Sequence, residues 1–304
     1  MSRHRLAIAT AALALAMAAA AQASTVYRWT DAQGRVHYAD RVDGTPRAGA
    51  VHRLALPAEA AAVARLRVEP DADGALAWVD NLLAGPIEVM LHAEGEAAVA
   101  SDPPLPARGT VQPRSATLLA RIARGNPRLR VVAVPGSPNA RPRDVEYAWP
   151  LASAPLRIQQ AWGGGYSHHD AENRHAVDFA APVGTPVVAA RDGVVMQAEA
   201  RFDEAGADED EAALLARANF IRVLHDDGTM ALYAHLQTGG VLVRTGQHVR
   251  RGQTIGRSGN TGLSTAPHLH FVVHANRGMR LESVPFRMFG PQGILRFDQA
   301  TPGG

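Results

Sequence analysis

Two histidines separated by one residue, His268 and His270, are the side chains of this sequence best placed to do chemistry. With Leu269 between them and Phe271 after them, an extended strand would put both imidazoles on one face and the apolar side chains on the other. Their Cα atoms would lie about 6.5–7 Å apart. That spacing suits one metal ligand beside one proton-transferring imidazole, although a solvated sheet face would show the same pattern.

The composition restricts both the metal ligands and the fold. The chain has no cysteine, so a transition metal must be held by His, Asp or Glu, a set that suits zinc. With 304 residues and 46% hydrophobic content, the chain can bury a sizeable core, and its length favours about two domains. The 28 glycines and 20 prolines favour short strands and turns, so we expect a mainly β fold.

The first 23 residues have the pattern of a secretory signal. Arg3 and Arg5 precede an apolar run over residues 6–20, and Ala21-Gln22-Ala23 is a small-x-small cleavage signal. The run is too short for a typical membrane anchor, and no later stretch could span a bilayer. We therefore expect an exported protein, periplasmic or secreted, with no transmembrane segment after signal removal.

The charge balance does not indicate a nucleic-acid partner. The formal net charge is +2, and every basic residue in the sequence is arginine. Removal of the signal takes away Arg3 and Arg5 and no acidic residue, which cancels this excess. The basic isoelectric point therefore reflects the absence of lysine and cysteine rather than a basic binding surface.

Residues 24–63 begin with two alternating runs, 26–30 and 35–40, around an Asp-Ala-Gln-Gly turn, which predicts a β-hairpin. The Tyr-x-Trp, Gly and Tyr-x-Asp landmarks resemble a small domain of unknown function found in proteobacterial envelope proteins. The resemblance covers only about twenty residues. It favours an envelope location and implies no chemistry.

The rest of the chain divides into three parts. Short apolar runs about ten residues apart predict a small, sandwich-like β domain over residues 64–148. Clearer alternation over residues 149–290 predicts a compact antiparallel β domain, interrupted by an acidic segment from Asp203 to Glu211 and a possible short helix at 212–217. Residues 291–304 are expected to form a C-terminal tail.

A series of motifs over residues 162–271 accompanies the two histidines. In order, they are Trp162-Gly163-Gly164-Gly165-Tyr166-Ser167-His168, Ala176-Val177-Asp178-Phe179, Pro182-Val183-Gly184-Thr185-Pro186-Val187, Tyr233-Ala234-His235-Leu236, Gly252-Gln253-Thr254-Ile255-Gly256, Ser258-Gly259-Asn260-Thr261-Gly262 and Pro267-His268-Leu269-His270-Phe271. This series resembles the lysostaphin/LytM-type zinc metallopeptidases. The resemblance implies a β domain with a groove, one zinc ion and hydrolysis of peptide bonds in peptidoglycan.

The resemblance also implies roles for individual residues. Asp178 matches the family's aspartate ligand and His270 the ligand of the His-x-His strand. His268 and His235 match the two histidines that do not bind zinc. We expect His268 to act as the general base and His235 to stabilise the oxyanion, with exchange of these roles left open.

The first histidine ligand departs from the commonest pattern. Many relatives place it four residues before the aspartate, where this chain has Arg174, which cannot bind zinc. A subset with Ser-His and a longer loop matches Ser167-His168, so His168 is the expected ligand. His169 and His175 are the alternatives, although in a strand His175 would face away from Asp178.

Two further residues are expected near the substrate. Asn219 resembles a family position beside the groove, although a backbone-binding role fits equally well. Tyr233 should share a face with His235 and could line the groove or pack in the core. His274 continues the parity of His268 and His270, and we expect it to be exposed.

Together these features predict an exported zinc metalloendopeptidase that hydrolyses stem-peptide cross-links of bacterial peptidoglycan. The alternative is a non-catalytic protein that binds peptidoglycan or activates a cell-wall amidase. Intact ligand and histidine positions favour the enzyme, since degenerate relatives lose one or more of them.

Overall fold

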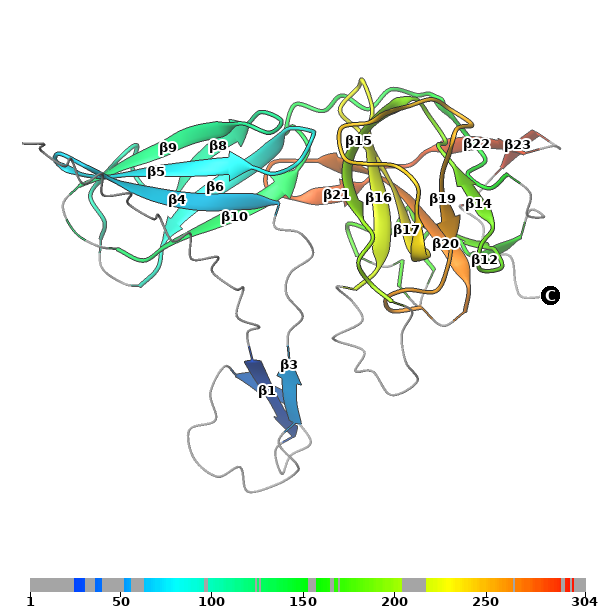
Figure 1. Cartoon of the computed structure of the whole chain (residues 1–304), viewed down its shortest axis with the longest axis horizontal. Helices are drawn as coiled ribbons and strands as arrows, with labels where there is room; N and C mark the ends of the chain where they lie inside the picture. The colour runs from blue at the N-terminus through cyan, green and yellow to red at the C-terminus, as the bar shows by residue number, and fades with distance from the viewer. Residues whose placement is uncertain are drawn as a thin grey trace, which may run out of the picture. The chain divides into compact units, whose positions relative to one another are not determined.

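The computed structural model describes residues 25–30, 36–39, 52–55, 63–95, 98–123, 125, 127–152, 157–164, 167–168, 170–203, 217–264, 266–290, 293–295 and 297. The expected signal, the hairpin turn, His169 and residues 204–216 of the acidic segment and helix lie outside these ranges. All regular elements of the described residues are strands, which confirms the mainly β fold (Figure 1). No helix among these residues is long and apolar enough to cross a membrane.

The chain forms two compact units, residues 1–58 and 59–304. In the first unit, β1 (Thr25–Thr30) pairs antiparallel with β2 (Val36–Ala39), as the alternation predicts, and with β3 (His52–Ala55). The third strand was not expected. Asp43-Gly44 and Pro46 precede it as turn signals, but its four residues form too short a run to be recognised as a strand from the sequence.

The second unit begins with two sheets that form the expected sandwich-like domain. One sheet has the order β4-β5-β9-β7 and the other β10-β6-β8. Their bounds are β4 Ala64–Asp71, β5 Gly74–Asn81, β6 Ile87–Ala93, β7 Ser101–Asp102, β8 Ala107–Val111, β9 Ala116–Ala123 and β10 Leu129–Pro135. Alternate residues such as Val79, Val89 and Ile122 are buried in one cluster, because strand side chains point to opposite faces.

The larger sheet has the order β12-β13-β20-β17-β16-β15-β18, with all pairs antiparallel. Strands β14 and β19 pair with each other, β19 also pairs with β17, and β21 pairs with β20. The bounds are β12 Ile158–Gln160, β13 Val177–Ala180, β14 Pro186–Val188, β15 Gly193–Glu199, β16 Asn219–Leu224, β17 Met230–Val241, β18 His248–Val249, β19 Thr254–Ser258, β20 His268–Asn276 and β21 Leu281–Ser283.

Strand β20 shows how this sheet separates chemistry from packing. Leu269, Phe271 and Val273 belong to the hydrophobic core, while His268 and His270 occupy the opposite face. The sheet therefore supplies a rigid floor on which polar residues from neighbouring strands meet.

The C-terminal segment contributes to this core, contrary to the expected tail. A small sheet joins β11 (Glu146–Ala148), β22 (Arg287–Gly290) and β23 (Gly293–Leu295). Phe297 is 2% exposed and packs against Trp162 and Phe286. The polar and glycine-rich residues around Phe297 in the sequence do not predict that its ring packs in the core.

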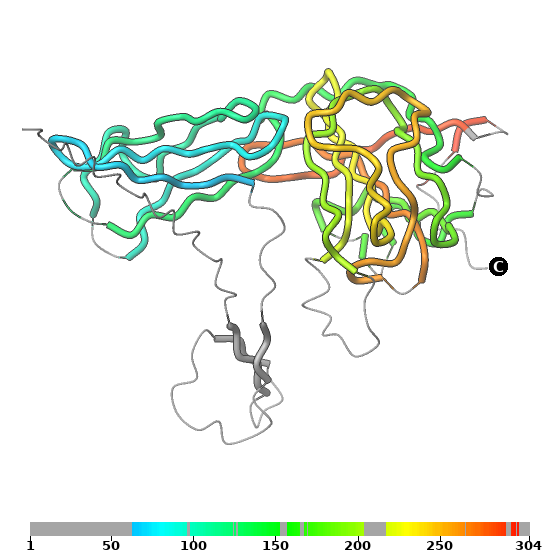
Figure 2. The backbone as a smooth tube through the Cα atoms, in the orientation of Figure 1, coloured from blue at the N-terminus to red at the C-terminus, as the bar shows by residue number. Residues whose placement is uncertain are grey.

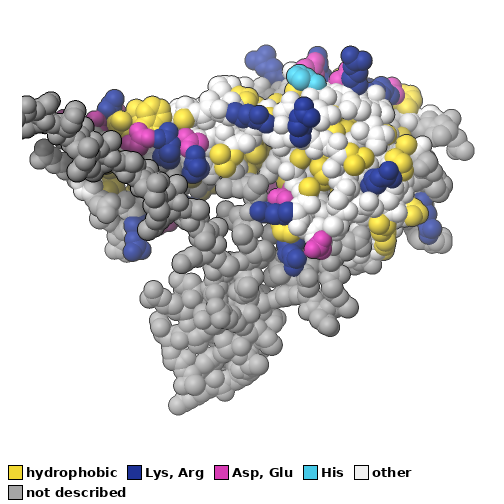
Figure 3. Space-filling view, viewed as in Figure 1, with side chains coloured by type: hydrophobic (Ala, Val, Ile, Leu, Met, Phe, Trp, Pro, Cys, Tyr) yellow, Lys and Arg dark blue, Asp and Glu magenta, His cyan; other side chains and the backbone are white. Residues whose placement is uncertain are grey.

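The sandwich-like domain and the larger sheet share packing. Met196 and Met230 of the larger sheet are buried in the sandwich cluster. The β20–β21 hairpin also reaches the sandwich, where the Met279 N–H donates to Glu88 Oε2 at 2.6 Å (Figure 2). On the face drawn in Figure 3, the basic side chains lie singly or in small groups among neutral, acidic and apolar ones.

Candidate metal centre

Two adjacent strands, β13 and β20, place the aspartate and the His-x-His pair together. Asp178 on β13 lies opposite His270 on β20, and Ala180 lies opposite His268. The Nδ1 atom of His270 is 2.9 Å from Asp178 Oδ1, and Nε2 of His268 is 3.7 Å from the same oxygen. The register of two strands thus brings an aspartate and two histidines to one point, although they are about ninety residues apart in the chain.

His168 enters this point from the loop that precedes β13. Its Nδ1 lies 2.9 Å from the Ala161 carbonyl, which can only accept, so Nδ1 carries the proton and Nε2 presents a lone pair. Nε2 is buried, has no hydrogen-bond partner among the described residues, and lies 3.3 Å from Asp178 Oδ1. Two acceptor atoms facing each other in a buried site call for a cation between them.

The donor set fits a zinc ion. One ligand atom each from His168, Asp178 and His270 lies within 4.8 Å of the other two. Two imidazoles and one carboxylate are a common zinc set, and three protein ligands leave a position for water or substrate. Burial raises the pKa of Asp178, but its interactions with His168, His270 and His268 outweigh this effect and hold the pKa far below its ordinary value.

The alternative ligand His175 is engaged elsewhere. Its Nδ1 lies 3.1 Å from both the carbonyl and the hydroxyl oxygen of Ser283, and its ring meets Trp162 edge-on at 5.1 Å. Burial lowers its pKa. Arg174, at the position of the usual histidine, is exposed.

His268 and His235 both present an unprotonated Nε2 to the site. The Nδ1 of His268 is 2.7 Å from the Ala266 carbonyl and that of His235 is 2.8 Å from the Thr261 carbonyl, so each Nδ1 donates. Burial lowers the pKa of both rings, for His235 to about 3. The rings are therefore neutral at pH 7, with centroids 4.7 Å apart.

An irregularity in β17 overturns the expectation for Tyr233. His235 has a φ of +59°, and the β16–β17 register shifts between Ile221 and Asn219. Strict alternation ends there, so His235 faces the groove with Leu232 and Ala234. Tyr233 points the other way, is fully buried, and its hydroxyl accepts from the Ala190 N–H at 2.8 Å.

Asn219 also lies behind the groove rather than in it. It is fully buried, and its side chain binds both the N–H and the carbonyl of Phe202 at 2.9 and 2.7 Å. Its own N–H donates to Thr261 Oγ1 at 3.0 Å. Asn219 therefore supports the segment whose carbonyl holds His235, the backbone role that had been the alternative.

His274 is 2% exposed, contrary to expectation. The loop before β13 covers this end of β20, and Nε2 of His274 lies 3.1 Å from the Glu172 carbonyl. The strand parity was correct, but it could not show that a loop would fold over the face.

At least three polar groove residues were not predicted as site residues. Gln160 Nε2 lies 3.5 Å from Asp178 Oδ2, and Ser264 Oγ lies 3.1 Å from His268 Nδ1. Ser264 stands four residues before His268, but neither its type nor its spacing is diagnostic. A third groove residue, Arg222 on β16, is charged and lies on the same face.

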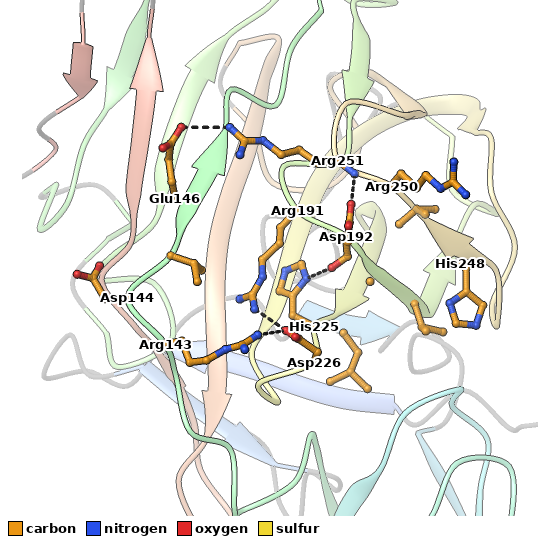
Figure 4. Close-up of a pocket in the computed structure, with 15 residues that line it drawn as sticks. Arg143, Asp144, Glu146, Arg191, Asp192, His225, Asp226, His248, Arg250 and Arg251 are labelled. Carbon is orange, nitrogen blue, oxygen red and sulfur yellow. Dashed lines mark hydrogen bonds and ion pairs between the residues drawn. The ribbon is translucent and has the colours of Figure 1, made fainter.

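The groove itself has a volume of about 440 Å³ and is lined by His235, His268, His270, Asp178 and Arg222, among others. A larger cavity of about 1070 Å³ lies elsewhere in the same unit (Figure 4). Several of its charged side chains form ion pairs with one another. Arg143 and Arg191 both bind Asp226, and Arg251 binds Glu146.

The model of peptidase family M23 matches residues 172–281. The chain carries a peptidase family M23 domain. The resemblance inferred from the motifs is thereby confirmed. A second family model, a domain of unknown function named DUF4124, matches residues 13–72.

Curated relatives share this M23 region. Peptidoglycan DD-endopeptidase ShyA of Vibrio cholerae is 41% identical over 97 residues, which are 32% of this chain and 19% of ShyA. Glycyl-glycine endopeptidase ALE-1 of Staphylococcus capitis is 42% identical over 100 residues, 33% of this chain and 24% of ALE-1. The matched region thus spans about a fifth to a quarter of these relatives.

Among solved structures, the catalytic domain of the antimicrobial peptidase lysostaphin from Staphylococcus simulans is similar at 33% identity. The match covers 40% of this chain and 81% of that domain, with a TM-score of 0.31.

Proposed function

We propose that this M23 domain, residues 149–290 with β11 and the segment through Phe297, is a zinc metalloendopeptidase that cuts peptide cross-links of peptidoglycan outside the cytoplasm. The observation that carries the proposal is the buried Nε2 of His168, which faces Asp178 Oδ1 at 3.3 Å with no hydrogen-bond partner among the described residues. His168, Asp178 and His270 would hold the ion. Zinc, when bound, supplies Lewis acidity that polarises a carbonyl and acidifies water.

The two remaining histidines would handle protons. His268 Nε2 can accept the proton of the attacking water, since its Nδ1 proton is committed to Ala266 and its ring is neutral. Asp178 close by stabilises the imidazolium that results. His235 can donate to the oxyanion through Nε2 only after gaining a proton there, because its Nδ1 proton is held by Thr261.

The substrate class is proposed from the relatives together with the groove. Both ShyA and ALE-1 are named endopeptidases, one a peptidoglycan DD-endopeptidase and the other a glycyl-glycine endopeptidase. An open groove on a sheet face suits an extended peptide. The signal pattern of residues 1–23 and the DUF4124 match favour action on the cell's own wall.

Digestion of purified sacculi tests the proposal. Zinc-loaded protein should release peptide fragments that mass spectrometry of the muropeptides identifies, and a chelator or His270→Ala should abolish the release. Binding to sacculi with no release, together with stimulation of an amidase, would instead establish the non-catalytic alternative.

A further inference from the structure

Arg222 is a cation in the groove that has no carboxylate partner among the described residues. It lies in the middle of β16, between Ile221 and Val223, which are fully buried in the core. Alternation therefore turns the arginine to the opposite face of the sheet, where it lines the same groove as His268 and His270. A strand of the core thus places the positive charge of Arg222 in the groove where the substrate would lie.

Few contacts satisfy its guanidinium. Nη1 donates to Gln197 Oε1 at 3.2 Å, and the group lies 5.8 Å from the centre of the Phe220 ring. Among the described residues, Nε is buried with no hydrogen-bond partner, and the one carboxylate that acts on the guanidinium, Glu172, forms no hydrogen bond with it. Glu172 acts on it only from a longer distance.

An unpaired cation of this kind costs stability. Burial lowers the pKa of Arg222 to about 10, with a partial offset from Glu172, so the group still carries its charge at neutral pH. Removing a charged group from water without a counter-ion is unfavourable, and a threonine or valine would suit a β-strand better. An anion that entered the groove would offset this cost.

The sheet register gives the distance of this cation from the metal ligands. Arg222 lies opposite Leu232, and Leu232 lies opposite Val272, two residues beyond His270. Two strand spacings and a two-residue step put the Cα atoms of Arg222 and His270 about 12 Å apart. The length of the arginine side chain reduces this distance. In an extended substrate, a carboxylate that lies within about two residues of the scissile bond could therefore reach the guanidinium.

We propose that Arg222 binds a free carboxylate of the substrate next to the scissile bond, and so selects acidic stem-peptide cross-links over bridges without a carboxylate, such as oligoglycine. This inference rests on the proposed function. Arginine suits the role because its planar fork binds a carboxylate through two hydrogen bonds.

The test uses cross-linked muropeptides in two forms, with free carboxylates and with carboxylates converted to amides. The zinc-loaded wild-type protein should cleave the free form with kcat/KM about 10- to 100-fold above the amidated form. The Arg222→Gln variant should cleave both forms equally, at the rate with which the wild type cleaves the amidated form. The Arg222→Lys variant should keep part of the preference for the free carboxylate. Arg250→Gln, an exposed arginine outside the groove, should match the wild type.

Two readouts separate binding from a structural role. Arg222→Gln should unfold at the same temperature as the wild type or a higher one, and a lower temperature would mark a structural arginine and overturn the inference. A retained preference in Arg222→Gln, or an equal loss on both forms, would also overturn it.

Failure of the proposed function would be recognised separately. If the wild type cleaves neither form, calorimetry of the binding of the two muropeptides to the metal-free protein tests the carboxylate site by itself. Tighter binding of the free form by the wild type but not by Arg222→Gln supports the carboxylate site, and equal binding by both proteins rejects it.

Discussion

The groove and the larger cavity of Figure 4 differ in how their polar groups are satisfied. The cavity has more than twice the volume, about 1070 Å³ against about 440 Å³, yet Arg143, Arg191 and Arg251 each bind a carboxylate there. Among the described residues, Arg222 Nε of the smaller groove and His168 Nε2 beside Asp178 are buried without partners, and the larger cavity has one such atom, His225 Nε2. The pairing of the arginines, rather than the volume, therefore distinguishes the groove from the larger cavity.

Two arginines make the comparison concrete. Burial lowers the pKa of Arg191, but hydrogen bonds to Asp227 and Tyr147 outweigh it and the net pKa is raised. Burial lowers the pKa of Arg222, and no such partner restores it. The first arginine is a structural group, whereas the second awaits an anion.

The largest effect is expected when a metal ligand is removed. His168→Ala should lose zinc and reduce hydrolysis by at least about 10³-fold, because the remaining two ligands cannot hold the ion as tightly. His175→Ala, the matched control from the same loop, should keep both. Metal analysis and muropeptide release measure these outcomes, and zinc loss in His175→Ala alone would exchange the two assignments.

Within the groove, His268→Ala should leave zinc bound and lower kcat by about 10²- to 10⁴-fold, the range typical of a lost general base. Metal content and steady-state kinetics on the same preparation separate the two effects. The kcat of a His235→Ala variant should be compared with that of His268→Ala. If it cost far more than His268→Ala, the base role would belong to His235.

In the larger cavity, a substitution should affect stability and not activity. Arg191→Gln removes the nearer ion partner of Asp227, whose side chain is 1% exposed, and leaves Arg143 Nε at 4.0 Å, so it should lower the free energy of unfolding by up to about 3 kcal/mol. Denaturant unfolding measures the loss. Loss of hydrolysis in a folded Arg191→Gln protein would show that the cavity takes part in the reaction.

The last prediction concerns the dependence of folding stability on acidic pH, through His225 at the larger cavity. Burial lowers the pKa of His225 from 6.5 to about 4, so the unfolded chain binds a proton at pH values where the folded chain does not. Stability should therefore be full above pH 6.5 and fall as the pH drops toward 4, by at most about 3 kcal/mol from this residue.

The control for this residue is His225→Gln, which cannot titrate and can still donate to the Asp192 carbonyl that His225 Nδ1 contacts at 2.7 Å. Its unfolding free energy should vary less with pH between 6.5 and 4 than that of the wild type. Parallel pH curves would show that His225 is protonated in the folded protein.

Much of the fold could be predicted because strand alternation is a local property. The runs at 220–224, 230–235 and 268–274 all lie in strands, and parity placed His268 and His270 on one face. Parity failed at Tyr233, because the positive φ at His235 interrupts the alternation. It also failed to show the burial of His274 and Phe297, since segments remote in sequence cover both.

The sequence by itself determined the β class, the His-x-His face, the absence of thiolate ligands and the resemblance to the M23 peptidases. Only the tertiary structure placed His168 rather than His175 beside Asp178, because a loop path depends on contacts such as Ala161 and Ser283. The difference between Arg191 and Arg222 was likewise decided in three dimensions. Two arginines look alike in a sequence, and the register of the surrounding strands and loops determines which one meets a carboxylate.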